Sequence, residues 1–90
     1  MEEKFLAAYA ANREKAEALG VRMRPMEDMT KAHRVLGGHK ESDGFYLLAQ
    51  KGKLELSLEA LAVKKQFTAL FTDEEANTAL MRLLDAGYRF

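Results

Sequence analysis

The sequence predicts an α+β fold, in which two N-terminal helices and a C-terminal helix pack with a small antiparallel sheet of three or four strands. Apolar residues recur at helical spacing over the first third of the chain and again near its end. Between these segments the pattern changes to an alternation of apolar and polar residues, which is typical of strands. With 90 residues, of which 48% are hydrophobic and 31% charged, the chain is expected to form one small globular domain, residues 1–90.

The first helix is predicted over Glu2–Leu19. Its apolar side chains follow helical spacing, and its six alanines raise the intrinsic helix propensity. Gly20 comes next, and a glycine can adopt the left-handed conformation that commonly ends a helix. The helix is therefore expected to end there.

A second helix is predicted over Pro25–Leu36. Proline fits the first position of a helix because its missing N–H group would have no helical partner there. Glu27 and Asp28 then lie in the first turn, where the helix dipole favours negative charge, and Gly37 follows the last turn. We expect a polar, glycine-flanked loop from Gly37 to Gly44.

The centre of the chain predicts a sheet. Phe45–Gln50 and Leu54–Glu59 read as a hairpin, because the second segment alternates strictly between apolar and polar residues. Gln66–Phe71, rich in aromatic and β-branched residues, reads as a third strand. A mainly helical alternative keeps a hairpin over Tyr46–Leu56 and makes Ser57–Phe71 helical, since Ser57 is a good capping residue.

The last helix is predicted over Asp73–Ala86. Thr72 and Glu75 have the spacing of a capping box, in which the two side chains satisfy free N–H groups of the first turn. The residues expected to face the core are Ala76, Ala79, Leu80, Leu83 and Leu84. The final segment Tyr88–Phe90, with two aromatic residues, is expected to dock and to pair with a sheet edge.

The six residues Phe71–Ala76, at the start of this helix, are similar to a segment of the enhanced-serine-sensitivity domain family and of many unrelated small α+β proteins. Helix capping accounts for these residue types, and the similarity implies no function. In size and style the chain is typical of a small accessory protein from a bacterium or its phages.

Charge and cysteine content exclude several classes of protein. Fourteen basic and fourteen acidic residues give a net charge of 0, so no overall field attracts nucleic acid or anionic lipid. The absence of cysteine excludes disulfides and thiolate chemistry. The acidic start Met1–Lys4 does not resemble a signal peptide, and no stretch has the roughly 20 apolar residues of a membrane span. We expect a cytoplasmic protein without membrane contact.

No residue pattern predicts catalysis. Ser42 and Ser57 lie outside any nucleophile motif, and the paired carboxylates fall at helix starts, where the helix dipole explains them. The two histidines, His33 and His39, do not have the spacing of a metal site with the nearby carboxylates. We therefore expect no enzymatic activity, no metal and no cofactor.

The region around the second helix is the predicted partner surface. Its methionines recur every third residue, a pattern that favours packing in the core and could also form an adaptable docking face. Its basic side chains could contact phosphates. Two functions follow: a non-enzymatic domain that binds a protein partner or a second copy of itself, or alternatively a regulator that binds nucleic acid. The candidate residues are Arg22, Arg24, Met26, Met29, Lys31, Arg34, His39 and Lys40.

Overall fold

The computed structural model describes residues 1–89, and over that range every regular element is helical. The elements in order are α1 (Glu2–Ala18), α2 (Met29–Leu36), α3 (Phe45–Gln50), the 3-10 helix η1 (Leu54–Leu56), α4 (Leu58–Ala62), the 3-10 helix η2 (Thr68–Leu70) and α5 (Asp73–Asp85). The predicted α+β fold is therefore wrong, because the described residues contain no strand and no sheet.

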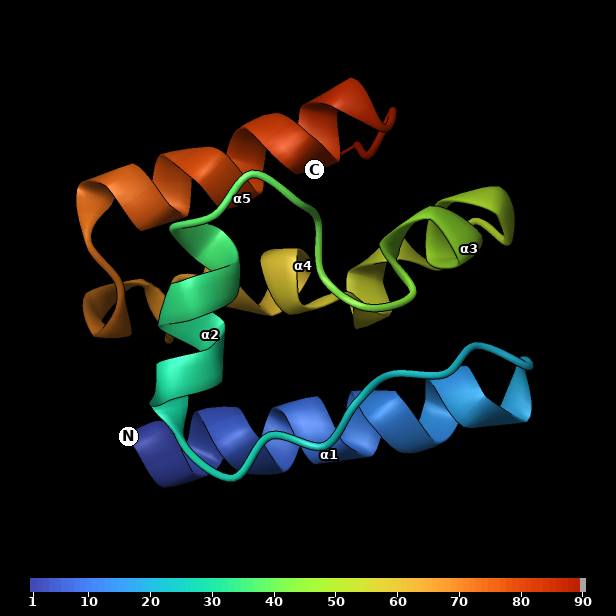
Figure 1. Ribbon diagram of the computed structural model, residues 1–90, viewed down its shortest axis with the longest axis horizontal. Coiled ribbons are helices and arrows are strands. Elements are labelled where there is room, and N and C mark those ends of the chain that lie inside the picture. Colours follow the sequence, from blue (N-terminus) through green and yellow to red (C-terminus); the bar gives the residue numbers. More distant parts are fainter. Residues whose placement is uncertain (90) are drawn as a thin grey trace.

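The short helix α4 lies at the centre of the molecule. It packs against α1 on one side and α5 on the other, while α2 crosses at one end and α3 lies at the other (Figure 1). All five residues of α4 are buried, including Glu59. A helix surrounded by protein on every side has no solvent face, so its sequence lacks the amphipathic period of a surface helix.

The predicted hairpin forms α3, η1 and α4 instead. In the first segment Phe45 and Leu48 both reach the core, which is the three-residue spacing of a helix. In the second segment the strand pattern counted Glu55 and Glu59 as solvent-facing, but only Glu55 is exposed. Ser57 caps α4 by accepting a hydrogen bond from the Ala60 N–H, as the helical alternative predicted, although that alternative also kept the hairpin.

The predicted third strand, Gln66–Phe71, contains the turn η2. Its two phenylalanines pack edge-on against Phe5 of α1, with ring centroids 5.2 Å away for Phe67 and 5.3 Å for Phe71. Ala69, which strand alternation placed on the same face, is exposed. A tight turn brings both rings to one point of the core, which a straight strand would not do. Pairing of Tyr88–Phe90 with a sheet edge is also wrong, and Phe90 lies outside the described residues.

The segment between α1 and α2 is extended and runs back along α1 (Figure 1). Two α1 side chains hold it: the Tyr9 hydroxyl donates to the Arg24 carbonyl at 2.8 Å, and Arg13 Nε donates to the Met23 carbonyl at 2.8 Å. The first helix ends as predicted, with Gly20 at φ +82°. The second helix begins four residues later than predicted, because the Asp28 carboxylate, rather than Pro25, provides its start.

The prediction for the last helix is confirmed, including the capping box of Thr72 and Glu75. Its buried face differs from the predicted one, since Leu84 is 49% exposed and Arg82 is 9% exposed. A paired arginine thus occupies a core position, while Leu84 faces solvent. Tyr88 packs against the edge of the core beyond the helix end.

Candidate functional site

The predicted partner surface is divided between the core and the solvent. Met29 is 6% exposed and belongs to the core, and Met26 is half-buried against it. Arg22, Arg34, His39 and Lys40 are exposed. The methionine face of the second helix therefore serves mainly to pack α2, which was the structural reading of the same pattern.

Two of the predicted basic residues share one carboxylate. Lys31 Nζ lies 3.3 Å from Asp43 Oδ2, and Arg24 Nε lies 3.9 Å from the same oxygen. The Arg24 backbone N–H also donates to it at 3.3 Å. Asp43 thus reduces the positive charge of this region and ties the loop before α3 to the extended linker.

A buried polar cluster fixes the loop between α2 and α3. Glu59 of α4, which is fully buried, accepts from the Ser42 backbone N–H at 2.9 Å, from the Ser42 hydroxyl and from Arg82 Nη1 at 3.2 Å. The same guanidinium donates to the Gly38 carbonyl at 3.0 Å. The cluster has no unpaired side-chain atom in the described residues, so its contacts account for a structural role.

A second polar contact joins α2 to α5. His33 Nδ1 lies 2.8 Å from Glu75 Oε2, and the imidazole also packs on Phe71. Burial of the carboxyl acts to raise the pKa of Glu75, but hydrogen bonds from the Thr72 N–H and from His33 outweigh it and hold that pKa below its ordinary value. A carboxylate that caps one helix therefore also anchors another.

Exposed apolar side chains gather on α3 and α5. Among the described residues five large hydrophobic side chains are exposed, and four belong to these two helices: Tyr46 (63% exposed) and Leu47 on α3, and Met81 (56% exposed) and Leu84 on α5. Met81 and Leu84 are three residues apart and so lie about one turn apart on the outer side of α5. Single exposed apolar residues are common, but a group of them marks a contact surface.

A shallow hollow lies between α5 and the loop that joins α2 to α3. It has a volume of about 410 Å³, and Glu41, Met81, Arg82 and Asp85 are among the residues that line it. Hydrogen bonding to the Tyr46 hydroxyl is the main reason why the pKa of Glu41 lies below its ordinary value, so Tyr46 stands beside the same hollow. We call Tyr46, Met81 and Leu84 the α5 patch.

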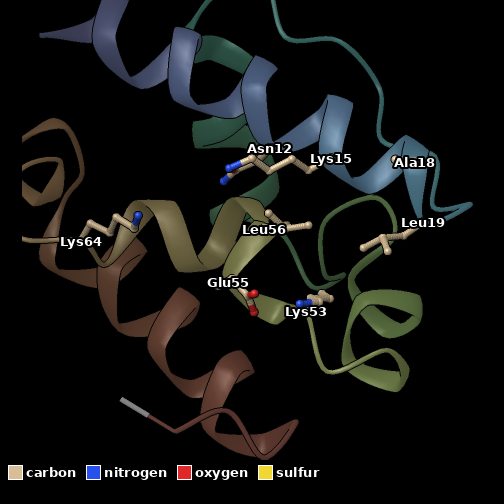
Figure 2. Close-up of a pocket in the computed structure, with 8 residues that line it drawn as sticks. All are labelled: Asn12, Lys15, Ala18, Leu19, Lys53, Glu55, Leu56 and Lys64. Carbon is tan, nitrogen blue, oxygen red and sulfur yellow. The ribbon is translucent and has the colours of Figure 1, made fainter.

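A different hollow lies between α1 and the segment η1–α4. Its volume is about 450 Å³. In Figure 2 the side chain of Leu56 lies between those of α1 and that of Glu55, with Lys53 and Lys64 on opposite sides. The lining residues are Asn12, Lys15, Ala18, Leu19, Lys53, Glu55, Leu56 and Lys64. We call this the lysine hollow.

Sequence reasoning did not find either surface. It placed Tyr46 in a strand and Leu84 in the core, and it gave Lys53 and Lys64 no role. One signal was present for the α5 patch: Arg82 interrupts the apolar stripe of α5 next to Leu83, and Glu59 interrupts an otherwise apolar run. Two opposite charges within apolar runs can indicate a buried pair, which changes the side of the helix that faces solvent.

Searches for a metal site, for a membrane-spanning helix and for similar proteins assign no further function. Within residues 1–89 no three histidine, cysteine or acidic side chains come together as a metal-binding group. The same part of the chain has no helix with the length and apolarity needed to cross a bilayer. The chain matches no protein-family model, no curated protein and no solved structure.

Proposed function

We propose that this protein is a non-enzymatic interaction domain that associates with a second copy of itself through the α5 patch. The observation that carries this proposal is the gathering of four of the five exposed large apolar side chains on α3 and α5. Removing such a group from water stabilises an association by roughly 25 cal/mol per Å² of apolar surface, before the entropy cost of association.

A two-fold axis through the outer side of α5 makes the patch complementary to itself. Two antiparallel α5 helices would place Met81 and Leu84 of one copy against the same residues of the other, as closed symmetric dimers require. The dipoles of the two helices would then be antiparallel, which is the favourable arrangement. The same arrangement brings Arg89 of one copy toward the acidic residues Asp73 and Glu74 of the other.

The substitution Met81→Glu tests this proposal, because it places a charge at the centre of the apolar contact. We expect sedimentation equilibrium of the wild type to approach twice the chain mass of 10.2 kDa with rising concentration. We expect Met81→Glu to weaken self-association at least tenfold, about 1.4 kcal/mol. Ala7→Glu, on the exposed side of α1, is the matched control and should associate like the wild type.

A wild-type mass that stays at one chain over the whole concentration range would contradict the proposal. Equal effects of Met81→Glu and Ala7→Glu would contradict it as well, since self-association would then respond to charge rather than to the patch. Circular dichroism of both variants checks that the helices are retained.

Nucleic-acid binding through the second helix has less support. Asp43 lies close to both Arg24 and Lys31, which lowers the charge that this region could offer to phosphates. If the alternative holds, affinity for duplex DNA or RNA falls steeply with salt and Arg34→Gln weakens it.

A further inference from the structure

The lysine hollow combines an apolar floor with a cationic rim. Leu56 is buried and Leu19 half-buried, and both line the hollow together with Ala18. The exposed side chains of Lys15 and Lys53 lie at its rim. Figure 2 shows these side chains coming from two separate segments, Lys15 from α1 above and Lys53 from the residue before η1 below.

The positive charge of this hollow is not neutralised from within. Three lysines and one carboxylate, Glu55, line it, which leaves an excess of two positive charges (three minus one). Within residues 1–89 none of the three lysines has a carboxylate oxygen within the 4.0 Å of an ion pair. The chain as a whole has a net charge of 0, so this excess is a local feature.

We propose that the lysine hollow binds a small organic anion, in which a carboxylate, sulfonate or phosphate is joined to an apolar body. The volume of about 450 Å³ lies within the range of roughly 300–1,000 Å³ found for small-molecule sites. The apolar body would cover Leu56 and Leu19, while the anionic group would lie in the positive potential of the surrounding lysines. The site is separate from the α5 patch and does not depend on self-association.

The direct test is an NMR titration of the ¹⁵N-labelled protein with 8-anilinonaphthalene-1-sulfonate and with octanoate. We expect saturable one-site shifts confined to the amides of residues 12–19, 53–56 and 64. Octylammonium, with the same apolar body and the opposite charge, and acetate, with the charge alone, should each bind at least tenfold more weakly.

Charge variants locate the site. Lys53→Gln and Lys64→Gln should each lower the affinity for octanoate about threefold to tenfold, which is the size of one Coulomb contact near a protein surface in salt. Glu55→Gln should raise the affinity by a similar factor. Lys40→Gln is the matched control, because it changes the net charge equally but lies in the loop after α2.

Three results would overturn the proposal: equal binding of octylammonium, shifts centred on another surface, or an equal loss of affinity in Lys40→Gln. Cosedimentation with phosphatidylglycerol vesicles distinguishes the two sources of such an anion. A lipid source predicts vesicle binding that Lys53→Gln reduces, and a free small molecule predicts octanoate binding without vesicle binding.

Discussion

At the scale of single residues, the ion pair of Glu59 and Arg82 decides how the centre of the molecule packs. Glu59 is fully buried, and the arginine and Ser42 are its partners. Arg82→Met should therefore lower the free energy of unfolding by about 3–5 kcal/mol, since it leaves a buried charge without compensation. Urea denaturation measures this loss.

The double variant Glu59→Gln/Arg82→Met provides the control for that prediction. If the two side chains act as a pair, the double variant loses less stability than the sum of the single variants. Arg34→Met, on the exposed side of α2, should change the free energy of unfolding by less than about 0.5 kcal/mol. A loss in Arg82→Met no larger than that would contradict a structural role for the pair.

Gly44 is the residue at which the backbone tolerates no side chain. Its φ is +75°, and a Cβ there would lie 2.6 Å from Val21 Cγ1 and 3.3 Å from the Arg22 carbonyl oxygen. Gly52 has a similar φ of +69° but no atom within 4 Å of such a Cβ. Gly52→Ala should therefore lower the free energy of unfolding only by the cost of a left-handed conformation, about 1–2 kcal/mol. Gly44→Ala should lower it clearly more, because its Cβ would also clash. Equal losses in thermal denaturation would show that the contact with Val21 is not tight.

At the scale of elements, the contact between His33 and Glu75 makes the packing of α2 on α5 depend on pH. The pKa of Glu75 is lower in the folded protein than its ordinary value of 4.5. Its carboxylate therefore stabilises the fold above pH 4.5, and this contribution is lost as the pH falls through the lower folded-state pKa. We therefore expect the urea concentration at the midpoint of unfolding to decrease as the pH falls below 4.5.

Glu75→Gln should flatten this decrease, because the amide does not titrate there. His33→Gln should flatten it in part, since Thr72 still donates to the carboxylate. Glu74→Gln, at an exposed position in the same first turn, is the matched control and should keep the slope of the wild type. An unchanged slope in Glu75→Gln would disprove the assignment.

The elements that the sequence predicts correctly are those with local signals. Helix α1 has a high alanine content and a terminal glycine, and α5 has a capping box, so neither depends on distant contacts. Three segments between Phe45 and Phe71 are predicted as strands, because they are short and rich in aromatic or β-branched residues or alternate between apolar and polar residues. Helix α4 is buried on all sides, and Glu59 can be a core residue because Ser42 and Arg82 come from other parts of the chain to pair with it.

The starting point of α2 was missed for a related reason. Pro25 suits a helix start, but the backbone carbonyls of Met23 and Arg24 are held extended by Arg13 and Tyr9 of α1. These hydrogen bonds join residues 10 and 15 positions apart in the chain. Propensity alone contains no information about them, and tertiary contacts outweigh it.

At the scale of the whole molecule, the surfaces left for partners are those that packing does not use. The methionines of the second helix could fill the core or form a docking face, and the fold buries Met29 in the core. Tyr46, Met81 and Leu84 were not predicted as a surface, because their exposure depends on how α3 and α5 pack in the fold. The exposed apolar side chains on which the proposed self-association rests are therefore evident only from the fold.

The most direct test of self-association through the α5 patch is intermolecular paramagnetic broadening. The chain has no cysteine, so Asp85→Cys provides a single site for a spin label at the rim of the patch. This labelled chain is mixed with the ¹⁵N-labelled wild type, and broadening of wild-type amides reports contact between copies. The account predicts broadening of residues 38–47 and 77–88 that Met81→Glu strongly reduces. Broadening centred on α1, or none at concentrations where the mass has doubled, would contradict it.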